Sequence, residues 1–219
     1  MNKKYLTEFL GTAALLSVIT GSGLMGQALS SGNDAVTLLG NSIATGAGLY
    51  VLIMILGPIS GAHFNPLVSV MAYTHKQLKR KDLLPYIASQ ITGAIAGVWV
   101  THLMFNLPII QTSTKIRIGL GIWVSEVIAT LILLTVIYLG LKYAKKHIAM
   151  IVALTVTAGY WFTSSTFFSN PAVTLARSLT NTFVGIAPEN ILGFVISQTI
   201  ALIFILKIIK KVSVKSFDA

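Results

Sequence analysis

The segment Ser164–Ser178 has the sequence SSTFFSNPAVTLARS, and its triplet Asn170-Pro171-Ala172 decides how the chain is expected to fold. Proline is favoured in the first turn of a helix, because the amide N–H that it lacks would have no partner there anyway. Asparagine is among the best residues for capping the start of a helix. The triplet therefore predicts the start of a short helix, in a part of the chain that otherwise has the composition of a membrane segment.

The composition of the chain excludes an ordinary soluble domain. Of its 219 residues, 54% are hydrophobic and only 10% are charged, and the mean hydropathy is +0.80. These values are typical of an integral membrane protein. The net charge of +10 does not indicate a nucleic-acid-binding protein, because the basic residues lie in short segments between apolar runs. The absence of cysteine excludes disulfides and cysteine-based metal or nucleophilic sites.

Six apolar runs are long enough to cross the ~30 Å hydrocarbon core of a bilayer. They lie at about residues 5–29, 37–57, 83–105, 119–141, 147–163 and 189–209. The first run continues too far for a signal peptide, so we interpret it as a retained span. Two further apolar segments, Ile59–Tyr73 and Ser164–Leu179, are too short to cross and are each interrupted by Asn-Pro. We expect these two segments to be re-entrant.

The chain also contains an internal repeat. TEFLGTAALL at residues 7–16 is echoed by SEVIATLILL at residues 125–134, and Asn65-Pro66 is echoed by Asn170-Pro171. Each half, about 1–105 and about 119–211, holds three spans and one re-entrant segment. Because three is odd, the second half must be inverted in the membrane relative to the first. We therefore expect one membrane domain over residues 1–219.

The basic residues predict the orientation of this domain. If the chain crosses six times, all but three of the 16 Lys and Arg residues fall on one side of the membrane. The exceptions are Lys115, Arg117 and Arg177. By the positive-inside rule, both termini are expected in the cytoplasm.

Two longer stretches, SGAHFNPLVSV at residues 60–70 and SNPAVTLARS at residues 169–178, resemble the signature motifs of the aquaporin and aquaglyceroporin (major intrinsic protein) family. Glu8 and Glu126, which open the two halves, match the same pattern, and the resemblance covers nearly the whole chain. It implies an all-α membrane protein with six transmembrane helices and two re-entrant half-helices. It also implies a homotetramer with one pore per chain in the bilayer of the inner membrane, with no cofactor, no metal and no enzymatic activity.

The two asparagines indicate how such a pore would select its solutes. If Asn65 and Asn170 each start a short helix at the centre of the membrane, two helix ends of about +0.5 charge each face one another and oppose cations. The side-chain amides would be free to donate hydrogen bonds to water or a polyol in the passage. We expect a passive channel for water and small uncharged solutes that excludes protons and ions.

Ionisable residues inside the spans are expensive to bury unless they have partners. We expect Glu8 and Glu126 to accept backbone N–H groups of the re-entrant loops, with Gln90 and Gln198 as further internal partners; proton relay is the alternative. His63 lies two residues before Asn65 and is expected at the cytoplasmic mouth. It would line the pore or brace the loop there, and pH sensing is the alternative.

Counting outward from the two motifs without gaps predicts the positions of the narrowest constriction in the family. They are Thr45, Ala158, Phe167 and Val173. Val173 stands where water-selective members of the family have arginine. None of the four residues is charged and two are small, so we expect an opening that is wider and less polar than a strict water filter. Glycerol, urea and metalloid acids such as arsenous acid are the expected solutes.

Two other residues depart from the family pattern. Arg177 follows Val173 by four residues, hence on the same helix face and ~6 Å further outward. We expect it to guard the extracellular mouth, and the alternative is that it pairs away from the pore. Leu67 stands in the first motif where alanine is usual, and its effect on the lumen is left open.

A secondary active transporter is the alternative function, because transporters also use inverted repeats and broken helices. Such a protein normally needs a coupling group near its central site. The only carboxylates expected within the spans are Glu8 and Glu126, which are already explained as braces. The sequence therefore favours the channel.

Overall fold

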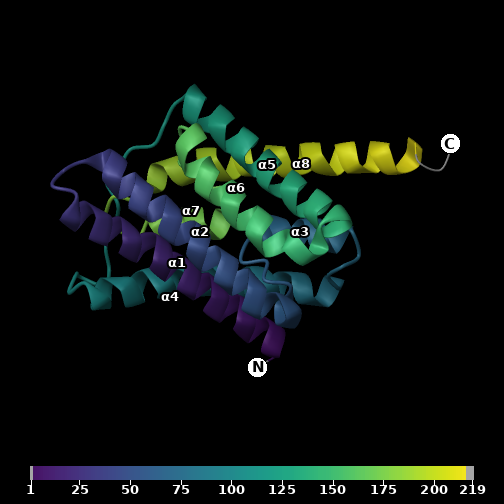
Figure 1. Cartoon of the computed structure of the whole chain (residues 1–219), viewed down its shortest axis with the longest axis horizontal. Coiled ribbons are helices and arrows are strands. Elements are labelled where there is room, and N and C mark those ends of the chain that lie inside the picture. The colour runs from purple at the N-terminus through teal and green to yellow at the C-terminus, as the bar shows by residue number, and fades with distance from the viewer. Residues whose placement is uncertain (1, 216–219) are drawn as a thin grey trace.

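The computed structural model describes residues 2–215, with side chains as far as Lys211, and within this range all of its regular secondary structure is helical (Figure 1). Two one-turn 3-10 helices, η1 (Lys145–His147) and η2 (Pro188–Asn190), precede longer helices. The main helices are α1 (Lys3–Leu29), α2 (Asp34–Ser60), α3 (Pro66–Thr74), α4 (Arg80–Met104), α5 (Leu120–Tyr143), α6 (Ile148–Phe162), α7 (Pro171–Arg177) and α8 (Ile191–Lys215).

The six predicted spans correspond to six of these helices. Five of them, α1, α2, α4, α5 and α8, are long and apolar enough to cross a bilayer. The sixth, α6, has only 15 residues, but none of them is charged. The two re-entrant segments contain the short helices α3 and α7, so the predicted order of three spans and one half-helix in each half is observed.

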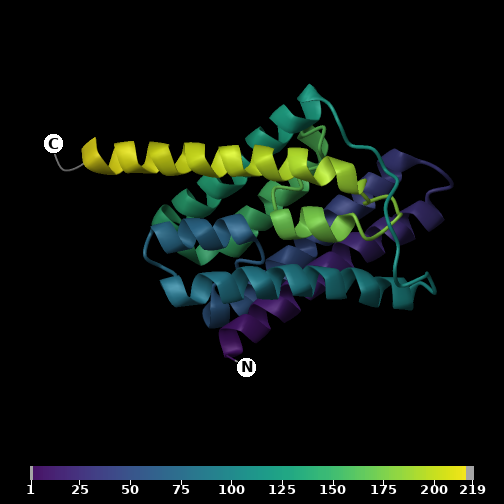
Figure 2. The ribbon, with the colours of Figure 1, turned by 180° about the vertical axis from the view of Figure 1, so that it is seen from behind.

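The two halves pack in the same way. Helix α1 lies against α2 and α4, and α5 lies against α6 and α8, while α3 and α7 contact each other (Figures 1 and 2). The approach of α1 to α4 depends on two glycines of the Gly-x-x-x-Gly type. A Cβ atom on Gly93 would collide with the backbone oxygen of Phe9, and one on Gly97 with that of Ala13. The two helices therefore pack backbone against backbone.

Both half-helices begin at the asparagines, as the triplets predict. The side-chain oxygen of Asn65 accepts a hydrogen bond from the amide of Leu67 at 2.9 Å. That of Asn170 accepts from Ala172 at 3.0 Å and from Val173 at 3.4 Å. A proline occupies the first helical turn in both cases.

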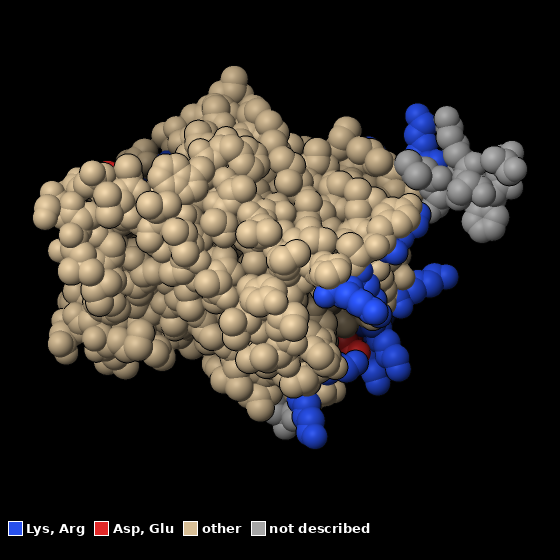
Figure 3. All heavy atoms as spheres, in the orientation of Figure 1, with Lys and Arg blue, Asp and Glu red and all other residues tan. Residues whose placement is uncertain are grey.

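The charged side chains lie mainly at one end of the molecule. Figure 3 shows Lys and Arg gathered at the end where α1 begins and α8 ends. The side chain of Lys215 is outside the described part of the structure. Of the three exceptions predicted above, Lys115 and Arg117 belong to the segment that follows α4, and Arg177 is the last residue of α7. The charge asymmetry required by the positive-inside rule is therefore present in the fold.

Candidate functional site

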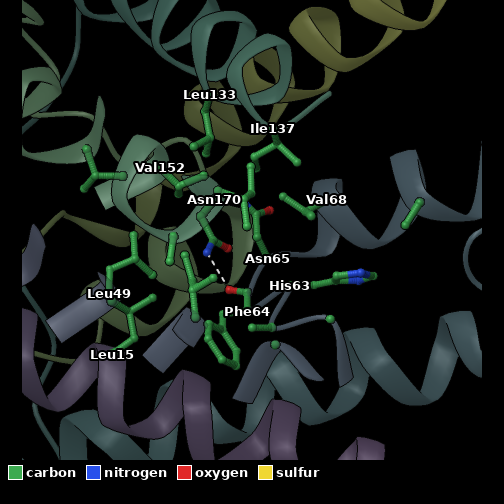
Figure 4. Close-up of a pocket in the computed structure, with 18 of the residues that line it drawn as sticks. Leu15, Leu49, His63, Phe64, Asn65, Val68, Leu133, Ile137, Val152 and Asn170 are labelled. Atoms are coloured by element: carbon green, nitrogen blue, oxygen red, sulfur yellow. Dashed lines mark hydrogen bonds between the residues drawn. The ribbon is translucent and has the colours of Figure 1, made fainter. Parts of the chain in front are cut away.

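A cavity of about 1110 Å³ extends between the two halves. At one end it is lined by lysines that include Lys4, Lys142 and Lys146, and at the other by Thr45 and Arg177. Its middle is lined by both re-entrant loops and by apolar side chains of α1, α2, α5 and α6 (Figure 4). The labelled members of this apolar wall are Leu15, Leu49, Leu133, Ile137 and Val152, and Val68 of α3 also lines the cavity.

The two asparagines meet at the centre of this cavity. The Nδ2 atom of Asn170 donates to the carbonyl oxygen of Phe64 at 2.7 Å, the dashed line in Figure 4. In the other direction, Nδ2 of Asn65 donates to the carbonyl of Ser169 at 2.8 Å. One N–H of each amide is thus used between the loops. The expectation that each amide can donate a hydrogen bond into the passage therefore depends on its second N–H.

The backbone of both loops adopts an unusual conformation directly before the asparagines. Phe64 has φ 48° and Ser169 has φ 47°, although neither is glycine. The left-handed region costs a non-glycine residue roughly 1–2 kcal/mol. These are the same two residues whose carbonyls accept the asparagine amides. The left-handed conformation therefore occurs at the two residues whose carbonyl groups join the half-helices by hydrogen bonds.

Glu8 holds the first loop, as predicted. Its fully buried carboxylate accepts hydrogen bonds from the amides of His63 at 3.0 Å and Phe64 at 2.8 Å. It also accepts from the Ser60 hydroxyl at 2.6 Å and from Gln90 Nε2 at 2.8 Å. A buried carboxylate with this many donors does not need a proton partner, which favours the bracing role over proton relay.

Glu126 holds the second loop in the corresponding way. It accepts from the amides of Phe168 and Ser169, both at 3.0 Å, and from Gln198 Nε2 at 2.7 Å. The same Gln198 amide reaches Thr174, one turn into α7, at 3.0 Å. Gln90 makes the equivalent bond to Ser69 in α3 at 2.8 Å. Each glutamate–glutamine pair therefore ties a spanning helix to both the loop and the half-helix of its repeat.

The structure differs at one position from the set of residues expected to form the outer constriction. Thr45, Phe167 and Val173 line the cavity as predicted, but Ala158 is exposed on the outer side of α6 and is not among the lining residues. Tyr160 lines the cavity instead, and its hydroxyl lies 3.2 Å from that of Thr45. Counting back from Asn170 without gaps assumes a fixed loop length. If the assumed loop length is wrong by two residues, the predicted position moves by about 200° around the helix, to its opposite face.

This correction changes the expected chemistry of the opening. Tyr160 is large and carries a hydroxyl group, whereas alanine is small and apolar. The prediction of a wide, weakly polar constriction therefore no longer follows. Helix periodicity contained the signal for the right residue, because Val152, Val156 and Tyr160 recur every four positions and all three line the cavity.

Arg177 combines features of both interpretations made from the sequence. It lines the cavity near its outer end but is only 2% exposed. Its Nε donates to the carbonyl of Val184, and its guanidinium carbon lies 3.5 Å from the centroid of the Phe168 ring. The side chain is thus anchored by neighbouring protein groups while it borders the lumen.

His63 and Leu67 lie on different sides of the first motif. His63 lines the cavity, with Nδ1 3.0 Å from the hydroxyl of Ser69 and its ring 5.3 Å from that of Tyr86. Leu67 does not line the cavity and packs into an apolar cluster with residues of α5 and α8 such as Leu134 and Leu202. The larger side chain at position 67 therefore fills the contact behind α3. Within the described part of the chain, no group of three or more His, Asp or Glu residues is placed to hold a metal ion.

Comparison with known proteins gives the same result as the geometry. A family model described as Major intrinsic protein matches residues 1–191. Aquaglyceroporin AqpS of Rhizobium meliloti is 45% identical over 210 residues, which cover 96% of this chain and 90% of that protein. Aquaporin-2 of Rattus norvegicus is 35% identical over 101 residues, which cover 46% of this chain and 35% of that protein.

A solved structure has the same fold at low sequence identity. The aquaglyceroporin from Plasmodium falciparum matches with a TM-score of 0.67 and 23% identity, covering 80% of this chain and 78% of that one. The similarity extends over both halves of the molecule as described above. This protein therefore belongs to the major intrinsic protein family, whose members are membrane channels for water and small solutes.

Proposed function

We propose that the protein is a passive channel whose solutes are small, uncharged molecules that form hydrogen bonds: water, glycerol, urea and undissociated metalloid acids such as arsenous acid. The observation that carries this proposal is the lining of the outer part of the cavity. Thr45 and Tyr160, whose hydroxyl groups lie 3.2 Å apart, line it together with the apolar side chains of Phe167 and Val173. A small polyol or hydroxylated acid has both kinds of surface and can match such a lining.

The middle of the cavity supports the same class of solute. Its side walls are apolar, and its polar groups come from the two re-entrant loops, with the remaining N–H of Asn65 and of Asn170 as donors. A solute that enters this part of the cavity gives up its hydration shell for these few polar groups. An ion would lose far more hydration free energy than the polar groups can replace, so the solute must be neutral. We propose that protons and metal cations are excluded in this way.

Helix ends and Arg177 add an electrostatic barrier to cations. The N-termini of α3 and α7 point at the cavity from opposite halves, each with a partial positive charge of about +0.5. Arg177 places a full positive charge near the outer end of the same cavity. We propose that it guards the extracellular mouth, one turn further out than the position that Val173 occupies.

A secondary active transporter remains the alternative, and the carboxylates argue against it. Glu8 and Glu126 have their oxygens engaged by loop amides and glutamines. Asp82, in the first turn of α4, accepts a hydrogen bond from the Tyr5 hydroxyl at 2.6 Å. None of these groups is placed as a free coupling site in the middle of the cavity.

The proposed channel would sit in the inner membrane with both termini in the cytoplasm. The basic end of the molecule supports this orientation. We also propose a homotetramer, in which part of the exposed apolar surface is buried between copies. Helix α2 alone exposes Val36, Leu39, Ile43, Val51, Met54 and Ile55. Chemical crosslinking in native membranes would test the assembly.

Stopped-flow light scattering on proteoliposomes tests the function. Glycerol, urea and arsenous acid should equilibrate without a proton or sodium gradient and with a low activation energy. Empty liposomes and liposomes with Asn65→Asp protein serve as controls. If uptake were saturable and required an ion gradient, the protein would be a transporter and the proposed channel function would be wrong.

A further inference from the structure

A second, smaller cavity of about 280 Å³ lies at the outer end of the molecule. Six of its lining residues matter here, and they are Asp34, Lys115, Arg117, Trp161, Thr166 and Arg177. Arg177 also lines the large cavity, so the small cavity adjoins the outer end of the lumen. Three of the six are cationic and one is acidic. The charge of Arg177 contributes to the barrier to cations proposed above, but the charges of Lys115 and Arg117 have no part in it.

The three cations converge from separate segments. Arg117 belongs to the segment after α4 and is 9% exposed, and Arg177 ends α7 and is 2% exposed. Both guanidinium groups lie against the ring of Phe168, at 5.2 Å and 3.5 Å from its centroid. Lys115 places its ammonium 4.6 Å from the ring of Phe183. Burial and the two arginines lower the pKa of Lys115 to about 8.

The hydrogen-bond partners of these cations are neutral. Lys115 Nζ donates to the carbonyl of Phe183 at 2.7 Å, Arg117 Nε to that of Gly185 at 2.8 Å, and Arg177 Nε to that of Val184. Within residues 2–211 no carboxylate is hydrogen-bonded to any of the three. Buried charges are normally paired. The cluster therefore lacks an anion.

The acidic residues nearby do not supply the missing charge. Glu126 spends both carboxylate oxygens on loop amides and Gln198. Asp34 lines the cavity but is exposed at the first turn of α2. The hydroxyl of Thr166, in the same wall, is buried and has no hydrogen-bond partner in the described part of the chain. Both a charge and a hydrogen-bond acceptor are thus missing at this place.

We propose that the outer cavity binds a small oxyanion through Arg117, Arg177 and Lys115. Guanidinium groups match the paired oxygens of such an anion, and they are more weakly hydrated than an ammonium. An anion bound in this cavity lies next to Arg177, which also lines the large cavity. Binding of the anion does not depend on which neutral solute the channel conducts.

Sulfate is a suitable probe, because its charge is constant near neutral pH. Purified protein in detergent is titrated calorimetrically with potassium sulfate, with potassium chloride keeping the ionic strength constant. We expect one saturable sulfate site per chain. Arg177→Gln and Arg117→Gln should each weaken sulfate binding at least tenfold, which corresponds to about 1.4 kcal/mol. Lys79→Gln, which removes an exposed charge at the opposite end of the molecule, is the matched control and should bind as the unmodified protein does.

Lys115→Gln provides a second test, since the Lys115 side chain is less buried than the arginines and its removal is better tolerated by the fold. It should weaken sulfate binding about threefold, which corresponds to about 0.65 kcal/mol. Absence of a saturable site, or equal affinity in Lys115→Gln and Lys79→Gln, would overturn the proposal. Glycerol flux is measured separately, so a failure of the proposed channel function would leave the result for sulfate unaffected.

Discussion

Replacing Tyr160 with phenylalanine tests whether the outer constriction recognises hydroxylated solutes. The change removes one oxygen from a fully enclosed pair, in which the hydroxyls of Tyr160 and Thr45 lie 3.2 Å apart on α6 and α2. The aromatic ring, which is only 3% exposed, keeps its volume and its packing. The substitution therefore changes the hydrogen-bonding capacity of the constriction and leaves its aperture nearly unchanged.

The size of the expected effect follows from one lost hydrogen bond. A neutral hydrogen bond contributes about 0.5–1.5 kcal/mol, which corresponds to roughly a 2- to 13-fold change in a rate or equilibrium constant. Glycerol permeability of Tyr160→Phe in proteoliposomes should fall within this range. Water permeability should change less, because water is small enough to use other groups of the lining at the same time.

Two control variants make the test specific. Tyr143→Phe removes a hydroxyl from a tyrosine that is 73% exposed and should change neither permeability. Thr45→Val removes the partner hydroxyl, and the double variant should be less impaired than the two single effects combined, since the paired groups act together. Equal glycerol permeability of Tyr160→Phe and the unmodified protein, measured at equal channel density, would refute this account of the constriction.

Three other predictions concern packing, bracing and charge. Gly97→Ala should lower the melting temperature of the protein in detergent, because overpacking against the backbone of Ala13 costs about 1–3 kcal/mol. Gly121→Ala is the control and should leave the melting temperature unchanged, since its new methyl group would meet open space. Glu126→Ala leaves two buried loop amides without an acceptor, which costs about 1–3 kcal/mol of stability for each amide. It should therefore also lower the melting temperature, and an unchanged melting temperature would exclude the bracing role. Sulfate binding should weaken as pH rises through about 8, because the pKa of Lys115 is lowered to about 8 and its ammonium is charged below that pKa and neutral above it. Calorimetric titrations at pH 7 and pH 9 measure this, and Lys115→Gln should reduce the difference.

Local chemistry explains why much of the fold could be predicted from the sequence. The helix starts at Asn65 and Asn170 are determined within a few residues, since the cap and the proline act on the same turn. The spans follow from the length of the apolar runs, and the inversion of the second half follows from the odd number of spans. The bracing by Glu8 and Glu126 was also predictable, because a carboxylate in hydrocarbon needs donors.

The constriction was predicted less well, because it depends on how a helix is turned. Ala158 and Tyr160 are two residues apart on α6, yet one faces outward and the other faces the lumen. The length of the loop between α6 and the second motif determines which face of α6 is turned to the lumen. A single sequence does not show how this length compares with that in related proteins. The pairing of Tyr160 with Thr45 also joins residues 115 positions apart.

Taken by itself, the amino-acid sequence determined the class of protein: a membrane-embedded inverted repeat with two helices that start inside the bilayer, since composition, period and capping act over short distances. Only the tertiary structure decided which groups face the solute. The crossed hydrogen bonds between Asn65 and Ser169 and between Asn170 and Phe64 require the two halves to meet. The convergence of Arg117 and Arg177 on one phenylalanine ring likewise brings together segments 60 residues apart, and no local pattern in the chain encodes it.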